Sequence, residues 1–210
     1  MIRVLAALHT VDYEAVGLAS YGKPGNYFGR QTGRWTKQYL AAQTQEIPAM
    51  NQLMQWLPEN MPNDDTISIV HGDYQLYNMM FHETEPRCTA VLDWELSTIG
   101  HPFADLAAVI MQWQRPVGPE GRGLAGVDRH AEGLMSDDEF IDAYCDRRGL
   151  ARIDKFGFYL AFTFFRMAGI VQGVKKRALD GNASNPERAL KVGSFVPQFA
   201  ESGLKAAKTV

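Results

Sequence analysis

The chain has 210 residues, of which 46% are hydrophobic and 21% charged, and its formal net charge at pH 7 is −3. This composition is ordinary for a globular protein with a sizeable core, and the length fits one large domain or two small ones. Because the charge is negative and no long basic run is present, we do not expect nucleic acid as a partner. Cys88 and Cys145 lack metal-binding or redox spacing, which favours a reducing, cytoplasmic location.

The first sixty residues predict helices separated by turns. The apolar stretch at the start is too short for a signal peptide and predicts a helix to about Val11. A turn rich in Gly and Pro follows over residues 17–25. Apolar side chains at helical spacing predict two more helices, over residues 30–43 and from Pro48 to about Pro58.

Three short apolar runs in the middle of the chain predict strands, over residues 67–70, 79–81 and 88–92. The polar turn 82–87 joins the last two, so we expect these two to pair.

Beyond residue 100 the pattern is helical, with a first core helix over residues 104–112. Residues 115–126 contain two prolines and four glycines and predict a loop that is a candidate mobile element. Ser136 and Glu139 form the pattern of a capping box and predict a helix that ends near Gly149. A long core helix and then a helix-rich tail from Pro186 are the last elements expected.

We expect that core helix over residues 153–179, with an interruption near Gly169 or Gly173. Its apolar part contains Thr163, Arg166 and Gln172, so we expect a buried helix and no membrane span. The sequence thus predicts an α+β fold that is mostly helical and carries a small β-ribbon, as a single domain over residues 1–210.

The segment from His71 to Asn78 carries the most information about function. It reads His-Gly-Asp, then four residues later Asn, and it follows an apolar strand. Asp93 ends the next predicted hairpin, fifteen residues after Asn78. An Asp and an Asn five positions apart on one loop, with a second Asp at the end of a later strand, is the arrangement of a kinase phosphoryl-transfer site.

The three side chains suit the roles that this reaction needs. Asp73 can accept the proton of an attacking hydroxyl, while Asn78 and Asp93 offer oxygens to Mg²⁺, which takes its other ligands from water and from the phosphates of ATP. Glu95 is either an additional ligand for metal or substrate or only a charge at the strand end. Gly-Asp pairs after strands are often plain turns, but the complete pattern between two strands favours the catalytic interpretation.

The chain resembles the C-terminal lobe of the aminoglycoside phosphotransferase family, which includes choline- and homoserine-kinase-like enzymes. Three segments carry the resemblance: Val70–Asn78, Val91–Glu95 and Gly100–Ala107. The resemblance implies a protein-kinase-like lobe in which Asp73 is the catalytic base and Asn78 and Asp93 bind Mg²⁺. It also implies that His71 braces the loop and that Asp105 ties down the backbone around it.

One departure concerns His101, where the family often has an acidic residue before the proline. The Gly-His-Pro sequence at this position resembles the branch of the family that is found fused to, or beside, acyl-CoA dehydrogenases. Four further segments point to the same branch: Gly17–Arg30, Arg34–Thr36, Arg166–Gly173 and Lys176–Asn182. This resemblance implies a small-molecule substrate with a hydroxyl group, and a hydroxyacyl compound or hydroxyacyl-CoA is favoured over an aminoglycoside.

A complete kinase of this type also has an N-terminal β-lobe with a phosphate-covering loop, a strand Lys and a helix Glu. Only 72 residues precede Asp73, and their pattern predicts mostly helices, so we expect that this N-terminal lobe is absent. We therefore expect the isolated chain to be almost inactive as a kinase. Uncovered apolar surface would then favour self-association.

Two other functions remain open at this point. A non-catalytic pseudokinase or binding module would explain the missing lobe, but would not require the three site residues. A metal-dependent hydrolase using His71, Asp73 and Asp93 is weaker, because no paired-histidine metal motif is present. Trp94 is expected to pack more than to stack on substrate, and Arg166 is either a substrate-anion site or part of a structural ion pair.

Overall fold

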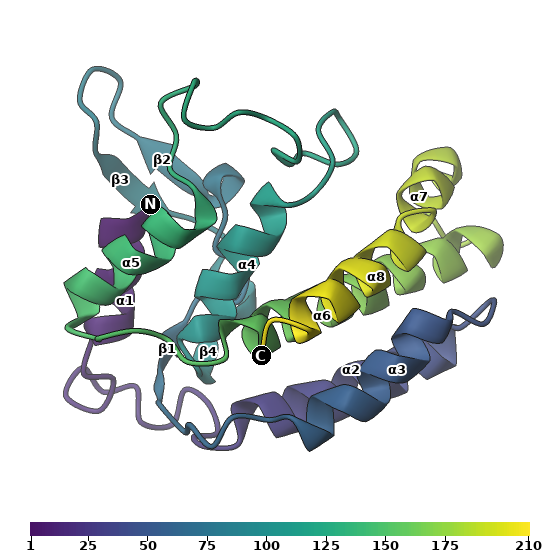
Figure 1. Cartoon of the computed structure of the whole chain (residues 1–210), viewed down its shortest axis with the longest axis horizontal. Helices are drawn as coiled ribbons and strands as arrows, with labels where there is room; N and C mark the ends of the chain where they lie inside the picture. Colours follow the sequence, from purple (N-terminus) through teal and green to yellow (C-terminus); the bar gives the residue numbers. More distant parts are fainter. The chain divides into compact units, whose positions relative to one another are not determined.

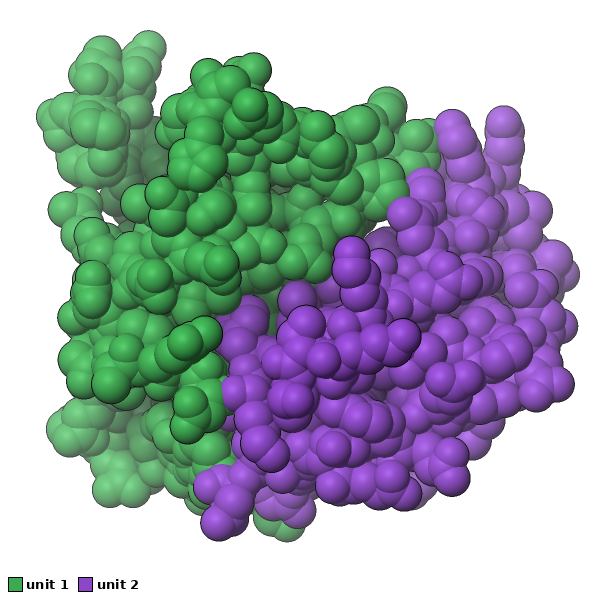
Figure 2. All heavy atoms as spheres, in the orientation of Figure 1, with its two compact units in different colours: residues 1–25, 64–154 green, residues 26–63, 155–210 purple.

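The computed structural model describes all residues from 1 to 210, and its contacts divide the chain into two compact units. The first unit contains residues 1–25 and 64–154, and the second contains residues 26–63 and 155–210 (Figure 2). Each unit is thus assembled from two separate stretches of the sequence.

The first unit contains three helices and four short strands (Figure 1). The helices are α1 (Ile2–Thr10), α4 (Phe103–Trp113) and α5 (Asp137–Arg148). The strands are β1 (Ser68–Val70), β2 (Met79–Phe81), β3 (Cys88–Val91) and β4 (Thr98–Gly100). Two single turns of 3₁₀ helix, Leu76–Asn78 and Trp94–Leu96, precede β2 and β4.

The strands form two separate antiparallel pairs. β2 and β3 make the predicted hairpin, with Met79 opposite Val91 and an irregularity after Met80. β1 pairs with β4, so that Ser68 lies opposite Gly100. All three residues of β1 are buried, and α1 packs against both β1 and α5. β1 therefore runs through the core of this unit and delivers the following loop from a rigid position.

Two helices of the first unit lie within one residue of where their sequences predict them. α5 has a complete capping box: the Ser136 side chain accepts from the Glu139 backbone, and the Glu139 carboxylate accepts from the Ser136 backbone. Gly149 ends this helix in the left-handed conformation, with φ of 65°. α4 is buried without interruption from Phe103 to Met111, as its apolar run predicts.

The second unit is entirely helical (Figure 1). Its helices are α2 (Tyr27–Ala42), α3 (Pro48–Glu59), α6 (Phe156–Leu179), α7 (Pro186–Gly193) and α8 (Val196–Ala207). α6 is central and contacts each of the other four helices. Phe28 of α2 lies among the aromatic rings of α6, with its ring centre 5.0 Å from that of Phe162 and 5.5 Å from that of Phe158.

The boundaries of these helices correct several predictions. α2 begins at Tyr27, three residues earlier than predicted, and α3 continues through Pro58 to Glu59. α6 begins at Phe156 and runs through both glycines, so the predicted interruption is wrong. A side chain at Gly169 would lie 3.5 Å from the Trp35 ring, which is ordinary contact distance. This glycine thus marks close packing of α6 against α2 and no break in the helix.

α6 is long and apolar enough to cross a membrane, but 67% of its most apolar window is buried inside the structure. The buried core helix of a globular protein has the same length and composition, and this burial is what the sequence predicts.

Candidate active site

The predicted catalytic loop starts directly after β1, where His71 and Gly72 are both buried. Gly72 has φ of +83°, and a Cβ at this position would lie 2.5 Å from the carbonyl oxygen of Leu96. Glycine is therefore required here for both its conformation and its size. The sharp turn at Gly72 directs the chain from the buried strand to Asp73, which is partly exposed.

The buried side chain of Asp105 binds the backbone of this turn. Its carboxylate accepts hydrogen bonds from the backbone nitrogens of His71, at 2.6 Å, and Gly72, at 2.9 Å. Asp105 is buried, which by itself would raise its pKa. The hydrogen bonds from His9, His71 and Gly72 outweigh burial and lower the pKa of Asp105 below its ordinary value. The carboxylate therefore stays ionised and bound to the loop.

His9 of α1 is the side-chain partner of this carboxylate. Its Nε2 lies 3.3 Å from Asp105 Oδ2, and its Nδ1 lies 2.8 Å from the hydroxyl of Tyr144 on α5. Burial lowers the pKa of His9, so the neutral ring is favoured, with Nε2–H donating to Asp105 and Tyr144 donating to Nδ1. Sequence analysis did not identify either residue, since their partners lie 96 and 135 positions away along the chain.

The His71 ring connects the two acidic segments of the site. Its Nε2 donates to the carbonyl of Leu92, at 2.9 Å, and its Nδ1 accepts from the backbone nitrogen of Asp73, at 3.3 Å. The ring of Trp94 packs against it with centres 4.7 Å apart. His71 thus positions the residues on either side of it and has no free ring nitrogen for a metal or a substrate proton.

Asp73 and Asn78 meet across the catalytic loop. The Asn78 amide nitrogen lies 2.9 Å from the Asp73 carbonyl oxygen and 3.0 Å from Asp73 Oδ2. Gln75 donates to the same carboxylate oxygen at 2.7 Å. Because the amide nitrogen of Asn78 is directed to Asp73, its oxygen Oδ1 is available to a cation. The other carboxylate oxygen of Asp73, Oδ1, has no protein donor and can face a hydroxyl group.

Asp93 lies two residues beyond β3 and is exposed. Its backbone is left-handed, with φ of 66°, which is uncommon for a residue with a side chain and is often associated with functional sites. The backbone nitrogen of Leu92 donates to the carbonyl of Asn78 at 2.8 Å, so the segments carrying Asn78 and Asp93 are joined.

These donors fit Mg²⁺ by their chemistry, since one amide oxygen and one carboxylate are the sparse, hard ligand set that this ion accepts. No cluster of three His, Cys, Asp or Glu side chains suited to a metal is present. Glu95 is exposed within the 3₁₀ turn after Asp93, and its carboxylate forms no hydrogen bond or ion pair. The structure brings Asp73, Asn78, His71 and Asp105 together, whereas Glu95 has no contact that assigns it a role.

The indole nitrogen of Trp94 donates to the carbonyl of Val91 at 2.8 Å, and its ring is tilted by 53° against that of His71. The side chain is 40% exposed, so packing in preference to substrate stacking stays a prediction.

Comparison with known proteins identifies the family. Residues 1–154 match the model of the phosphotransferase enzyme family. The chain belongs to this family. The match contains the whole of the catalytic loop, Asp93 and Asp105, and thus the complete candidate site of this phosphotransferase chain.

Curated relatives include proteins with an acyl-CoA dehydrogenase name. The phosphotransferase chain is 45% identical over 202 residues to mouse acyl-CoA dehydrogenase family member 10, covering 96% of the chain and 19% of that protein. It is 43% identical over 211 residues to human acyl-CoA dehydrogenase family member 11, covering 99% of the chain and 26% of that protein. The chain therefore spans about a fifth to a quarter of these relatives.

Among solved structures, a provisionally described aminoglycoside phosphotransferase of Ralstonia eutropha is 51% identical, with a TM-score of 0.94. The match covers 99% of this chain and 63% of that one. Choline kinase from Cryptosporidium parvum is 10% identical, with a TM-score of 0.60, over 97% of this chain and 64% of its own. This second likeness shows the fold alone, and it confirms the predicted kinase-like α+β class.

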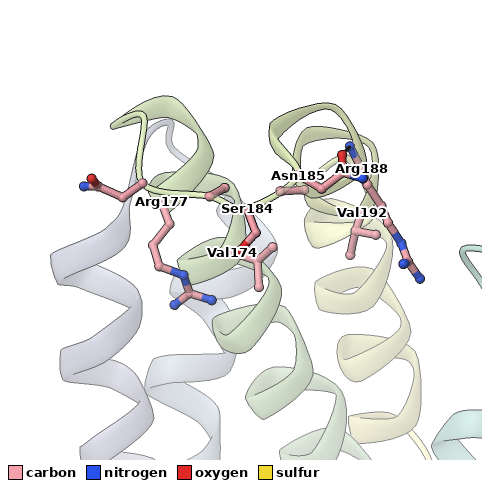
Figure 3. Close-up of a pocket in the computed structure, with 9 residues that line it drawn as sticks. Val174, Arg177, Ser184, Asn185, Arg188 and Val192 are labelled. Atoms are coloured by element: carbon pink, nitrogen blue, oxygen red, sulfur yellow. Dashed lines mark hydrogen bonds between the residues drawn. The ribbon is translucent and has the colours of Figure 1, made fainter.

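A separate cavity of about 290 Å³ lies in the all-helical unit of the phosphotransferase chain, at the turn between α6 and α7. Val174, Ala189 and Val192 contribute an apolar floor. Arg177 and Arg188 lie at opposite ends of the cavity, and their guanidinium groups do not converge (Figure 3). The cavity consequently lacks the paired donors of an anion site.

Arg166, which sequence analysis left open, also lies in this unit. Its guanidinium carbon is 5.8 Å from the ring centre of Trp35, and Arg34 lies 5.7 Å from the same ring. A cation–π contact to Trp35 is thus one structural partner of Arg166.

Proposed function

We propose that this chain carries the catalytic base and the magnesium ligands of an ATP-dependent small-molecule kinase. The observation that carries the proposal is the Asp73–Asn78 pair on a loop whose backbone is clamped by buried Asp105. Family membership supports the reaction type, and the hydrogen-bond geometry supports the assignment of roles to these residues.

The proposed reaction transfers the γ-phosphoryl group of ATP to a substrate hydroxyl. Asp73 accepts the hydroxyl proton, the oxygen forms the new bond to phosphorus, and ADP leaves with the former bridging oxygen. Gln75 and Asn78 hold one carboxylate oxygen of Asp73, so that the other can face the hydroxyl. Asn78 and Asp93 would hold Mg²⁺, which neutralises phosphate charge when bound. Glu95 is proposed only as a further ligand.

The 72 residues before Asp73 contain no Gly-rich loop between strands and no strand with a Lys. We therefore propose that these 210 residues act as the C-terminal lobe and that a nucleotide-binding lobe completes the site. Removing one preorganised electrostatic group costs about 10²–10³ in rate, so we expect negligible turnover without that lobe.

For the acceptor we propose a hydroxyacyl compound or hydroxyacyl-CoA. The support is the 43–45% identity to relatives named as acyl-CoA dehydrogenase family members, over nearly the whole chain. The likeness to a described aminoglycoside phosphotransferase supports the phosphotransferase class.

The test is thermal unfolding of the chain with ADP and Mg²⁺, separately and together. Because only the phosphate and Mg²⁺ contacts are assigned to this lobe, we expect a small stabilisation at high ligand concentration that needs both ADP and Mg²⁺ and is lost in Asp93→Asn. Glu83→Gln, which removes a carboxylate from the exposed hairpin turn, is the matched control and should behave as the parent. If ADP with Mg²⁺ stabilises Glu95→Gln as much as the parent, Glu95 is not a ligand and is only a charge near the strand end.

Turnover is measured by coupled ADP release, with Asp73→Asn as the control. Activity of the isolated chain that disappears in Asp73→Asn would contradict the proposed need for a second lobe. Absence of any magnesium-dependent nucleotide binding would instead favour a non-catalytic binding module. Stabilisation by zinc or manganese alone would favour a hydrolase, an alternative that is weakened because both ring nitrogens of His71 are engaged.

Self-association and a cytoplasmic location remain predictions. Large apolar side chains are exposed on the catalytic loop, on the β2–β3 hairpin and on the segment after it, at Leu76, Tyr77, Met80, Phe81, Leu92 and Leu96. We propose that they form the surface for self-association. Light scattering across a concentration series checks this, and a monomer throughout would contradict it.

A further inference from the structure

The segment between α4 and α5 is irregular but internally bonded. Backbone hydrogen bonds cross it from Leu124 to Trp113, at 2.8 Å, from Gly123 to Pro116, at 2.9 Å, and from Ala125 to the carbonyl of Arg115, at 3.1 Å. A Cβ at Gly123 would lie 1.9 Å from the carbonyl oxygen of Arg115, so the two sides touch. We call residues 113–125 the arginine loop.

Side chains at the base of the arginine loop hold it to α5. Asp137 accepts from Gln114 at 2.7 Å and pairs with Arg129, also at 2.7 Å. The Arg129 guanidinium lies over the Trp113 ring at 5.2 Å, and Trp113 packs on Phe140 with centres 4.7 Å apart. The start of the loop is therefore anchored to α5, and the backbone hydrogen bond from Leu124 to Trp113 joins the other end of the loop to that start.

The arginine loop and the end of α4 directly before it each contact the catalytic loop. Gln112, at the end of α4, donates to the carbonyl of Tyr74 at 3.3 Å. The guanidinium carbon of Arg122 lies 5.3 Å from the ring centre of Tyr77, which is 67% exposed and lies between Asp73 and Asn78 in the sequence. These contacts place Arg122 above the loop that carries the proposed base.

Arg115 lies within electrostatic range of the same groups. Burial lowers its pKa most, the positive charge of Arg122 lowers it further, and Tyr77 and Asp73 raise it. The geometry fixes Arg122 through its contact with the Tyr77 ring, and it holds Arg115 within the same loop, where its Nη2 donates to the Glu120 carbonyl at 3.5 Å. Arg122 forms no ion pair with a carboxylate; its guanidinium donates to the Pro119 carbonyl, at 3.2 Å, and lies over the Tyr77 ring.

The positive charges of Arg115 and Arg122 repel one another, and an anion that binds near them relieves this repulsion. Guanidinium groups bind carboxylates and phosphates through paired hydrogen bonds, and they repel a polycation. We propose that Arg115 and Arg122 bind an anionic group of the acceptor, a carboxylate or a phosphate, while its hydroxyl faces Asp73. The proposal rests on the proposed kinase function, and it makes these arginines determinants of acceptor specificity.

The test is calorimetric binding of four probes to the chain: 3-hydroxybutyrate, 3-hydroxybutyryl-CoA, neutral 1,3-butanediol and cationic kanamycin. We expect at least one of the two anionic probes to bind, and we expect neither neutral butanediol nor cationic kanamycin to bind. Binding of hydroxybutyrate identifies a carboxylate site, and binding of the thioester alone identifies a phosphate site. Kanamycin binding as tight as that of the anions, or no binding of either anion, overturns the proposal.

The deciding variant is Arg122→Gln, which removes the charge from an exposed side chain and should not prevent folding. We expect the Kd of the anionic probe to rise at least about tenfold, as for loss of one charged hydrogen-bond pair, and Arg122→Lys to recover part of it. Arg87→Gln, at an exposed arginine of the hairpin turn, is the matched control and should leave Kd unchanged. An unchanged Kd in Arg122→Gln overturns the proposal.

Binding of ADP with Mg²⁺ separates this inference from the kinase function. We expect Arg122→Gln to leave that binding intact and Asp93→Asn to abolish it. If Arg122→Gln weakens nucleotide binding and spares the anionic probe, the arginine serves the nucleotide and the inference fails while the kinase proposal stands. If the anion binds through Arg122 but no nucleotide binds, the kinase proposal fails and the anion site stands.

Discussion

The carboxylate of Asp105 lies 2.6 Å from the backbone nitrogen of His71, across 34 positions of sequence. A second carboxylate oxygen holds the next nitrogen, that of Gly72, so one buried side chain fixes two successive peptide groups. Asp73 follows directly, so its position is determined by a buried residue of α4.

We expect Asp105→Asn to lower the free energy of unfolding by about 3 kcal/mol, because a buried charged acceptor is replaced by a neutral group with only one acceptor oxygen. The amide nitrogen would then face a backbone N–H or the His9 ring. Urea unfolding measures the change.

Asp180→Asn is the control for that variant. Asp180 forms an exposed ion pair with Lys176 one helical turn away, so its loss should cost about 0.5 kcal/mol or less. Equal effects of the two variants would mean that the clamp at Asp105 contributes no more than a surface ion pair.

We expect Gly72→Ala to be more destabilising than Gly17→Ala. Both glycines have φ near +80°, so both variants carry the strain of a left-handed side chain, about 1 kcal/mol. Only at Gly72 would the new Cβ collide, 2.5 Å from the Leu96 carbonyl oxygen, whereas nothing lies within 4 Å at Gly17. Urea unfolding of the two variants measures the difference, which we attribute to the collision. Similar losses would show that the Leu96 backbone moves aside freely.

The features that the sequence predicts well are those with local causes. The capping box at Ser136 and Glu139, the β2–β3 hairpin and the end of α5 at Gly149 each depend on residues a few positions apart. The catalytic loop is of the same kind, since Asp73 and Asn78 meet within five residues.

The features that escaped prediction depend on distant partners. β4 is only three residues long, and its pairing with β1 joins segments about thirty positions apart. The contact between His9 and Tyr144 spans 135 positions, and neither residue belongs to a recognisable motif. Residues 26–63 and 155–210 likewise form one unit because their helices pack on α6, and no local sequence pattern predicts this packing.

We expect Ser136→Ala to destabilise the first unit by about 1 kcal/mol, since the serine side chain caps the backbone nitrogen of Glu139 at 3.2 Å. Thermal unfolding measures the loss. Ser194→Ala, at an exposed serine whose hydroxyl donates to the Lys191 carbonyl, should cost less, because that carbonyl can accept from water instead. A smaller loss at Ser136 than at Ser194 would contradict the importance of the capping box.

The chain should lose stability as the pH falls from 7.5 to 5.5. Burial lowers the pKa of His9 and of His101 below the ordinary value of 6.5, so near pH 6 the unfolded chain binds more protons than the folded one. Protonation therefore favours unfolding once the pH falls through the unfolded value. Asp105, whose pKa is also lowered, adds a further loss only below its ordinary value of 3.8.

Thermal midpoints across this pH range measure the effect, and His9→Asn identifies the share of one group. The variant should be less stable at pH 7.5, because it removes the contact to Asp105, yet its midpoint should depend less on pH between 7.5 and 5.5. His101 pairs with Asp64 at 3.3 Å and remains in the variant, so part of the slope should persist. An identical slope in the parent and in His9→Asn would show that His9 is not neutral in the folded chain.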